Sequence, residues 1–212
     1  MLLGTLAALW RYPVKSLRAQ ALTRVAVLAD GLEGDRRGAL VVTAPDNARA
    51  GKTFRGKESS RLHLTDDPDA AIGYAADAGV AVALDRSAPR WFDAGTVSLL
   101  LDLWVHDAET LVGMPLDPLR WRPNLVVTAA PGITVREADL VGATIAIGSV
   151  RLHVDDTIKR CVTTTYDIAT GVSDPRVLRE VAQRRANVMG VYCSVPTPGE
   201  IAVGQTLTLA FP

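Results

Sequence analysis

The sequence has very few cysteines and no excess of charge of either sign. Only Cys161 and Cys193 occur among 212 residues, so one disulfide is possible but a disulfide-stapled scaffold is excluded. Lys and Arg together number 23, and so do Asp and Glu. A nucleic-acid-binding protein usually carries excess positive charge, which displaces counterions from phosphates. We therefore expect no nucleic-acid partner.

Long apolar runs are also missing. A helix that spans a bilayer needs ~20 consecutive apolar residues, and the apolar N-terminal stretch ends already at Arg11. It is not preceded by the basic region that a secretory signal would have. We therefore expect a soluble, cytoplasmic protein without a membrane partner. A hydrophobic content of 48% is sufficient for one sizeable core or for two small subdomains.

Short runs rich in Val, Leu and Ala dominate the chain and are separated by Gly, Pro, Asp and Asn. Their lengths and β-branched residues favour strands, and Gly148-Ser149 is a hairpin turn signal. There is no alternation of strands with long helices, which disfavours a doubly wound sheet and predicts a β-rich α+β fold. The expected strands are Leu2 to Trp10, Ala21 to Leu28, Ala39 to Thr43, Val80 to Leu84, Leu125 to Thr128, Thr144 to Ile147, Val150 to Val154, Val188 to Val195 and Thr206 to Phe211.

Three helices are expected. The clearest begins at Pro175, because Asp174 can cap it and proline is tolerated at the first helical position. A short surface helix is predicted from Ala70 to Ala76. The continuous apolar run from Val97 to Trp104 is also predicted to be a helix. The remainder of residues 45–79 is interpreted as a solvated loop.

Cys161 is the residue best suited to chemistry. It follows Lys159-Arg160 and precedes three threonines, and positive charge nearby favours the thiolate, which is the nucleophile and metal ligand. A lone cysteine is more often a small buried apolar residue, and Cys193, inside an apolar run, fits that interpretation. A nucleophilic pair of Cys161 with His153 stays open. No histidine has a partner at the spacing of a zinc site, so all three are interpreted as structural or exposed.

Cations and small polar residues recur in three other motifs. Arginine offers a planar fork of donors that suits phosphate or carboxylate. Taken singly, each cation is more often a solvated loop charge. Combined with one thiolate, they suit an anionic ligand whose metal takes a soft sulfur donor. The residues concerned are Lys15, Ser16, Arg36, Arg122 and Asn124.

These motifs, in this order, carry a resemblance to a known family: Tyr12-Pro13-Val14-Lys15-Ser16, Gly34-Asp35-Arg36, Arg122-Pro123-Asn124 and Arg160-Cys161. The chain resembles the MOSC family, the C-terminal domain of molybdenum cofactor sulfurase, and is similar to the amidoxime-reducing component-like members. The resemblance implies a MOSC-type β-barrel with a few peripheral helices. A shortened MOSC N-terminal-like β subdomain would occupy residues 1–90, and the MOSC domain would occupy residues 91–212.

The resemblance also implies a cofactor and a reaction. The cofactor would be the molybdenum cofactor (Mo-molybdopterin), an anionic pyranopterin dithiolene with a terminal phosphate, and Cys161 would ligate its metal. The reaction would be the reduction of small N-hydroxylated or N-oxygenated compounds. Because the chain carries no four-cysteine iron–sulfur domain, electrons would come from a separate protein, such as a ferredoxin, a flavodoxin or a cytochrome-type reductase system. The implied cofactor-binding residues are Lys15, Ser16, Arg36, Ser98, Arg122, Asn124, Arg160 and Tyr192.

Two alternatives to an oxidoreductase are retained. In the first, the protein is a sulfur carrier or handles the molybdenum cofactor, and Cys161 carries a persulfide. In the second, it is a plain β-barrel binding module in which Cys161 is structural. Low reactivity of Cys161 toward alkylating reagents would favour the last of these.

Overall fold

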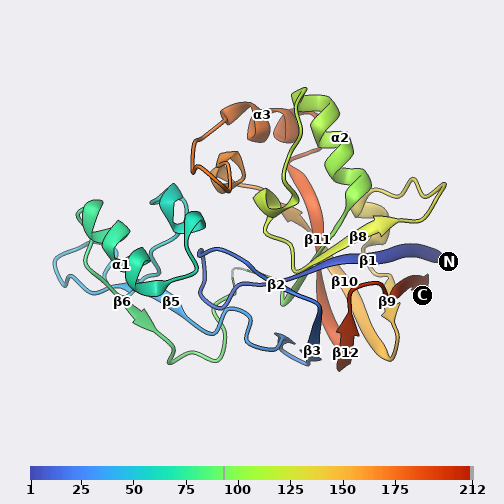
Figure 1. Ribbon diagram of the computed structural model, residues 1–212, viewed down its shortest axis with the longest axis horizontal. Helices are drawn as coiled ribbons and strands as arrows, with labels where there is room; N and C mark the ends of the chain where they lie inside the picture. Colours follow the sequence, from blue (N-terminus) through green and yellow to red (C-terminus); the bar gives the residue numbers. More distant parts are fainter. Residues whose placement is uncertain (93, 211–212) are drawn as a thin grey trace.

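A closed barrel forms the centre of the protein. The structure, a computed structural model, describes residues 1–92 and 94–210. Eight strands follow the order β13-β9-β10-β11-β7-β8-β1-β2, and pairing of β13 with β1 closes seven of them into a barrel (Figure 1). The strands are β1 (Leu2–Arg11), β2 (Gln20–Leu22), β7 (Val97–Leu101), β8 (Leu125–Ala129), β9 (Thr144–Ile147), β10 (Val150–Lys159), β11 (Val188–Thr197) and β13 (Thr206–Ala210).

The remaining elements flank the barrel. Figure 1 shows α2 and α3 together against one side of it, whereas α1 lies apart with β5 and β6. A three-stranded sheet consists of β3 (Arg24–Leu28), β4 (Gly31–Leu32) and β12 (Gly199–Ala202), and a hairpin consists of β5 (Ala39–Val42) and β6 (Val82–Asp85). The helices are α1 (Pro68–Asp77), α2 (Asp102–Val112) and α3 (Pro175–Arg184), with 3-10 turns η1 (Ser60–Leu64), η2 (Pro118–Trp121), η3 (Glu137–Leu140) and η4 (Val162–Thr165).

Two separate hydrophobic clusters hold these elements. The larger fills the barrel and the space beneath α2 and α3. Strand β1 contributes Leu3, Leu6 and Leu9 to it; these are three residues apart rather than two, and the register of β1 shifts between Leu2 and Gly4 and between Leu6 and Ala8. The smaller cluster lies under α1 and has its own core residues, Val14, Leu17, Leu40, Val42, Phe54, Leu62, Ala71 and Ala75.

The predicted fold class is confirmed, but the run from Val97 to Trp104 was assigned wrongly. Its first part is the strand β7, and α2 begins only at Asp102. Every residue of β7 is buried, because the strand lies between β8 and β11 in the middle of the sheet. A strand covered on both faces shows no alternation, so its pattern was taken for that of a helix.

Most other strands match their predictions closely. The stretch from Ala21 to Leu28 is two strands, since β2 pairs with β1 while β3 pairs with β12. Strand β10 continues to Lys159, beyond the predicted end, through several register shifts. The hairpin turn at Gly148-Ser149 is confirmed, because Ile147 pairs with Val150. The predicted end of the last strand, Phe211, lies outside the described residues.

The helix capped by Asp174 begins where predicted, whereas α1 begins two residues before its predicted start. The carboxylate of Asp174 accepts the backbone N–H of Arg176 at 3.0 Å, and Pro175 starts α3. In α1, Asp67 is the cap and Pro68 opens the helix. The apolar stripe of α3 is narrower than predicted, because Val177 and Val181 are buried whereas Ala182 is exposed.

The first strand joins the two ends of the chain. Strand β1 pairs with β8 and β13 inside the barrel, and the division of the chain after residue 90 stays a prediction.

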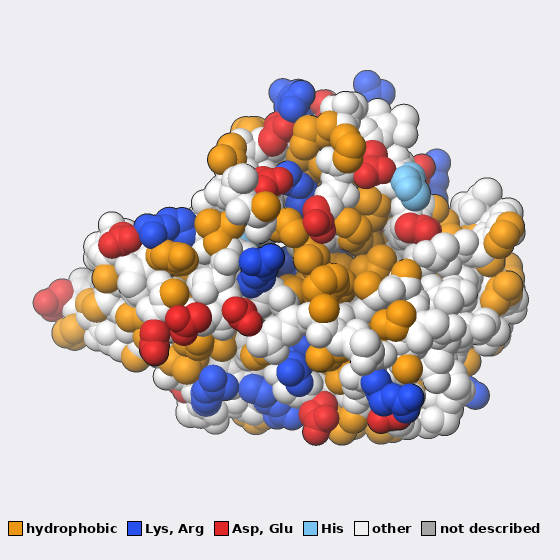
Figure 2. Space-filling view, in the orientation of Figure 1, with side chains coloured by type: hydrophobic (Ala, Val, Ile, Leu, Met, Phe, Trp, Pro, Cys, Tyr) orange, Lys and Arg blue, Asp and Glu red, His pale blue; other side chains and the backbone are white. Residues whose placement is uncertain are grey.

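On the face seen in Figure 2, Lys and Arg side chains are interspersed with Asp and Glu side chains. Within the described residues, no helix has the length and apolar character to cross a membrane.

Candidate functional site

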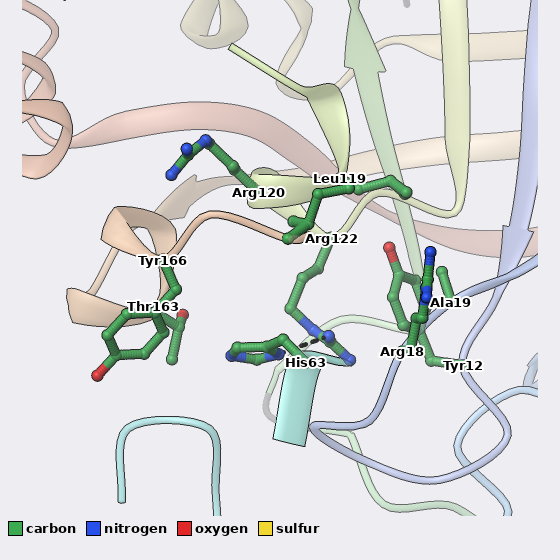
Figure 3. Close-up of a pocket in the computed structure, with 10 residues that line it drawn as sticks. Tyr12, Arg18, Ala19, His63, Leu119, Arg120, Arg122, Thr163 and Tyr166 are labelled. Atoms are coloured by element: carbon green, nitrogen blue, oxygen red, sulfur yellow. Dashed lines mark hydrogen bonds between the residues drawn. The ribbon is translucent and has the colours of Figure 1, made fainter. Parts of the chain in front are cut away.

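A pocket lies where the smaller hydrophobic cluster meets the barrel (Figure 3). Its volume is about 20 Å³, and its mouth is partly open to solvent. Four segments that are far apart in the sequence build its wall, so it exists only in the folded chain. They contribute Tyr12, Arg18 and Ala19; His63; Leu119, Arg120 and Arg122; and Thr163, Tyr166 and Ile168.

Cys161 stands beside this pocket. It lies just after β10 and immediately before η4, and its side chain is exposed. Its Sγ atom is 3.2 Å from the Oγ1 atom of Thr163, which lines the pocket. Cys193 is buried, as predicted, and burial raises the pKa of its thiol. Both cysteines are free, which leaves Cys161 as the accessible thiol.

Arg160 supplies positive charge behind Cys161. Its Nε atom donates to the carbonyl oxygen of Met189 at 2.7 Å, and its Nη1 atom donates to that of Trp121 at 2.8 Å. Burial lowers its pKa to about 10, while Tyr192 and Cys161 act in the opposite direction. Among the described residues no ion pair involves Arg160. A negative charge at Cys161 would therefore stabilise this largely buried cation.

The ring of Tyr12 contacts two cations. The guanidinium carbon of Arg122 is 4.3 Å from its ring centroid, and that of Arg36 is 4.9 Å away. The hydroxyl donates to the carbonyl oxygen of Pro123 at 3.1 Å. Burial raises the pKa of Tyr12 to about 12, although both arginines act to lower it. The phenol is therefore protonated at neutral pH and offers the cations an aromatic face.

Arg36 is held by a buried carboxylate. It forms an ion pair with Asp35, whose side chain is fully buried, and donates to Oδ1 of Asn124 at 3.3 Å. The same carboxylate accepts the backbone N–H of Tyr12 at 2.7 Å. Arg36 adopts a left-handed backbone with φ of 49°, and Arg122 does the same with φ of 50°. Such angles are uncommon outside glycine, and here they place both side chains against one tyrosine.

Ser98 and Asn124 lie beneath the arginines rather than in the pocket wall. The Ser98 hydroxyl donates to Oδ1 of Asn124 at 3.0 Å, and Asn124 N–H lies 2.9 Å from that hydroxyl. The amide nitrogen of Asn124 donates to the carbonyl oxygen of Trp10 at 3.1 Å. Both side chains are buried. Their polar atoms therefore tie β7, β8 and β1 together and support Arg36.

The other predicted residues surround the same centre. Lys15 and Ser16 are half-buried, and Ser16 has a left-handed backbone with φ of 70°. Tyr192 is half-buried in β11, where it pairs with Ser98 of β7, and it acts to raise the pKa values of Arg36 and Arg160. The structure thus gathers the residues predicted from distant motifs around Tyr12, Tyr192 and Cys161.

His63 belongs to the pocket but was missed in the sequence. Its side chain is only 7% exposed, and Nη1 of Arg122 lies 3.1 Å from its Nδ1 atom. Its ring also contacts Tyr166, with centroids 5.9 Å apart. His63 lies in the polar segment that was interpreted as a solvated loop. No local pattern indicates that this segment folds back onto Cys161.

A nucleophilic pair of Cys161 with His153 is excluded by the strand geometry. His153 lies in β10, six residues before its last residue, Lys159. At roughly 3.3 Å per residue, that separation is on the order of 20 Å. Across residues 1–92 and 94–210, no three His, Cys, Asp or Glu side chains form a group that could hold a metal ion.

The comparison with protein families agrees with this arrangement. The profile of the MOSC domain matches residues 98–208, just over half of the chain. The chain belongs to the MOSC domain family. The matched range contains Ser98, Arg122, Asn124, Cys161 and Tyr192. MOSC domains are associated with the binding or handling of the molybdenum cofactor.

One solved structure shows the same overall fold at low sequence identity. The crystal structure of the YuaD protein from Bacillus subtilis is 15% identical, with a TM-score of 0.59 over 97% of this chain and 94% of that one. The YiiM protein from Escherichia coli is also 15% identical, with a TM-score of 0.48 over 95% of this chain and 70% of that one. None of the curated proteins compared with the sequence matches it.

Proposed function

We propose that this MOSC protein binds the molybdenum cofactor through Cys161 and reduces small N-hydroxylated or N-oxygenated compounds. The observation that carries the proposal is the exposed thiol of Cys161, which stands between a largely buried cation, Arg160, and a pocket lined by Arg122 and Thr163. A soft thiolate surrounded by donors and cations suits an anionic ligand that contains a thiophilic metal.

The donor set fits the cofactor. All three guanidinium nitrogens of Arg160 donate hydrogen bonds to backbone carbonyl oxygens. Arg160 would therefore stabilise a negative charge at Cys161 electrostatically and not by a direct hydrogen bond. Arg122 and Arg36 both present guanidinium groups to the ring of Tyr12 and would bind the phosphate and pterin. Thr163 places a hydroxyl 3.2 Å from Sγ and can donate to a thiolate. When bound, the cofactor would supply the redox-active metal.

The reaction requires two electrons and two protons for each molecule of substrate. In an N-hydroxylated substrate the N–O bond breaks, one proton goes to the nitrogen, and the other goes to the hydroxyl group, which leaves as water. In an N-oxide both protons go to the oxygen. The pocket beside Cys161 would orient the substrate, with Tyr166 and Leu119 in its wall. The electrons would come from a separate donor protein, such as a ferredoxin, a flavodoxin or a cytochrome-type reductase system.

Elemental analysis tests the proposal. Protein made in a host that synthesises the cofactor is expected to contain close to one molybdenum per chain, and Cys161→Ala is expected to lose most of it. Cys193→Ala, at the buried cysteine, is the matched control and should retain the metal. Trace molybdenum that Cys161→Ala leaves unchanged contradicts the proposal. With metal present, reduction of an aromatic amidoxime by a reduced viologen dye tests the reaction.

A second function is favoured by the exposure of Cys161. An exposed thiolate can accept a sulfur atom from a donor persulfide: the donor's S–S bond breaks, a new S–S bond forms on Sγ, and the donor leaves as a thiolate. The protein would then be a sulfur carrier or a cofactor-handling protein. Intact-mass measurement after incubation with a sulfur donor should show one added sulfur in the wild type and none in Cys161→Ala. An unchanged wild-type mass rules this function out.

A further inference from the structure

His63 and Arg122 form a contact that the motifs do not account for. His63 comes from η1, next to the smaller hydrophobic cluster, whereas Arg122 follows η2 and precedes β8. Figure 3 shows the side chain of Arg122 reaching between the His63 ring and Tyr12, and the dashed line marks its contact with His63. Both side chains line the pocket beside Cys161.

The chemistry of the two groups fixes the direction of the hydrogen bond. A guanidinium group has only donors, so Nη1 of Arg122 donates and Nδ1 of His63 accepts at 3.1 Å. Acceptance requires a neutral imidazole. Burial, followed by the positive charge of Arg122, lowers the pKa of His63 to about 3, and a backbone contact with Ser16 opposes the shift only in part. The ring is therefore neutral at neutral pH.

The space around the ring is fitted to this orientation. Gly56 packs against the other ring nitrogen, and a Cβ atom at this position would lie 2.4 Å from Nε2. Only glycine leaves room for the ring here. Nε2 has no hydrogen-bond partner among the described residues, so the ring is oriented by its contact with Arg122 and by its hydrogen bond with the backbone of Ser16.

A neutral hydrogen-bond acceptor can orient a neighbouring cation without neutralising its charge. It fixes the direction of one N–H of the guanidinium and adds no negative charge to the pocket. Arg36 shows the other arrangement, because the carboxylate of Asp35 holds it and adds a negative charge. An aspartate at position 63 would hold Arg122 equally well, but it would repel an anionic ligand.

We propose that His63 is a positioning residue for an anionic ligand: it holds the guanidinium of Arg122 over Tyr12 and toward the pocket without adding a counter-charge. The ligand class is a phosphate or a similar oxyanion, alone or as part of a larger molecule. The inference rests on the proposed function only where that molecule is the molybdenum cofactor, because binding of a free oxyanion can be measured without it.

Three substitutions at position 63 separate the effect of the hydrogen-bond acceptor from the effect of a negative charge. His63→Asn keeps a neutral hydrogen-bond acceptor near the position of Nδ1. His63→Asp introduces a side chain of the same size as asparagine that carries a negative charge. His63→Leu removes the acceptor. The measurement is the dissociation constant for inorganic phosphate, by calorimetric titration of protein from a host without the cofactor. We expect His63→Asn to remain within about twofold of the wild type, and the other two to bind on the order of tenfold more weakly.

Controls exclude a loss of fold. The denaturation midpoint of each variant is compared with that of His106→Leu, which changes an exposed histidine on α2. If His63→Leu does not fold, the Asn and Asp variants still decide the question, because they differ only in charge. Gly56→Ala, which crowds Nε2, should also weaken phosphate binding.

A double-mutant cycle tests whether His63 acts through Arg122. In an Arg122→Leu background, His63→Leu should have no further effect on phosphate binding. The inference is overturned if the wild type shows no saturable phosphate binding, if His63→Leu binds as the wild type does, or if His63→Asn loses as much as His63→Leu. Molybdenum content is measured separately. If the wild type made in a host that synthesises the cofactor contains no molybdenum, while the cofactor-free protein shows the expected phosphate pattern, the proposed function is refuted and the role of His63 stays supported.

Discussion

The Nε atom of Arg160 donates to the carbonyl oxygen of Met189 at 2.7 Å, which ties the cation beside Cys161 to strand β11. A second bond, to the carbonyl oxygen of Trp121, ties it to η2. The same guanidinium therefore supports two elements of the fold and supplies positive charge to the thiol. These two roles can be separated by measuring stability and metal content on the same variant.

Replacement of Arg160 by methionine should destabilise the fold. Arg160→Met leaves two inward-facing carbonyl oxygens without charged donors, so we expect the free energy of unfolding to fall by about 2–4 kcal/mol in urea denaturation. Lys159→Met is the neighbouring control, because Lys159 is exposed, and should stay within about 0.5 kcal/mol of the wild type. Equal stabilities of the wild type and Arg160→Met would contradict the structural role.

Ser98 and Asn124 should behave as one unit. Each single change to alanine leaves a buried polar partner unsatisfied, so we expect each to lower stability by about 1–3 kcal/mol. The double variant should lose less than the sum of the two, by at least about 0.5 kcal/mol. A complete double-mutant cycle in urea measures this coupling. Strict additivity would show that the bonds between the two residues contribute little.

The two thiols should differ in reactivity. In native buffer an alkylating reagent should modify Cys161, which is exposed, and leave the buried Cys193 unmodified. In denaturant both should react, because unfolding removes the protection of Cys193. Intact-mass spectrometry counts the modified thiols. An unreactive Cys161 in the native protein would instead support the interpretation of this residue as structural.

Acid should destabilise the protein partly through His63. The unfolded chain takes up a proton near pH 6.5, whereas the folded chain takes it up only near pH 3. Between these values the unfolded state binds more protons than the folded state. The free energy of unfolding therefore decreases as the pH is lowered, by as much as about 1.4 kcal/mol per pH unit. Urea denaturation at about pH 7.5 and about pH 5 should show a smaller loss for His63→Asn. Equal losses would mean that His63 is not buried as a neutral ring.

Local sequence patterns were sufficient for most of the barrel. The strand ending before Pro13, the hairpin at Gly148 and the helix capped by Asp174 each follow from neighbouring residues alone. The strand beginning at Val97 was misassigned, because its burial on both faces depends on partners distant in sequence. Hydrophobic periodicity shows which face of a helix or strand is buried. A strand that is buried on both faces has no such periodicity.

The candidate site was predictable only in part. Motifs around Arg36, Arg122 and Cys161 identified residues that the structure brings around Tyr12. Ser98 and Asn124 were expected to face the ligand, but their polar atoms are used within the protein. The role of His63 could not be predicted, because it depends on a contact between residues 59 positions apart and on the absence of a side chain at Gly56.

The pocket is lined both by a residue next to the smaller hydrophobic cluster and by residues that follow a barrel strand. Leu62, in the core of the smaller cluster, precedes His63, whereas Thr163 follows a barrel strand. The smaller cluster is built from few side chains and lies outside the closed barrel, so it is the part expected to open first by local unfolding. A preparation could then keep the circular dichroism spectrum and sharp main transition of the barrel while its binding site is dismantled. Retention of overall fold is therefore an insufficient control for any inactive variant of residues 39–85.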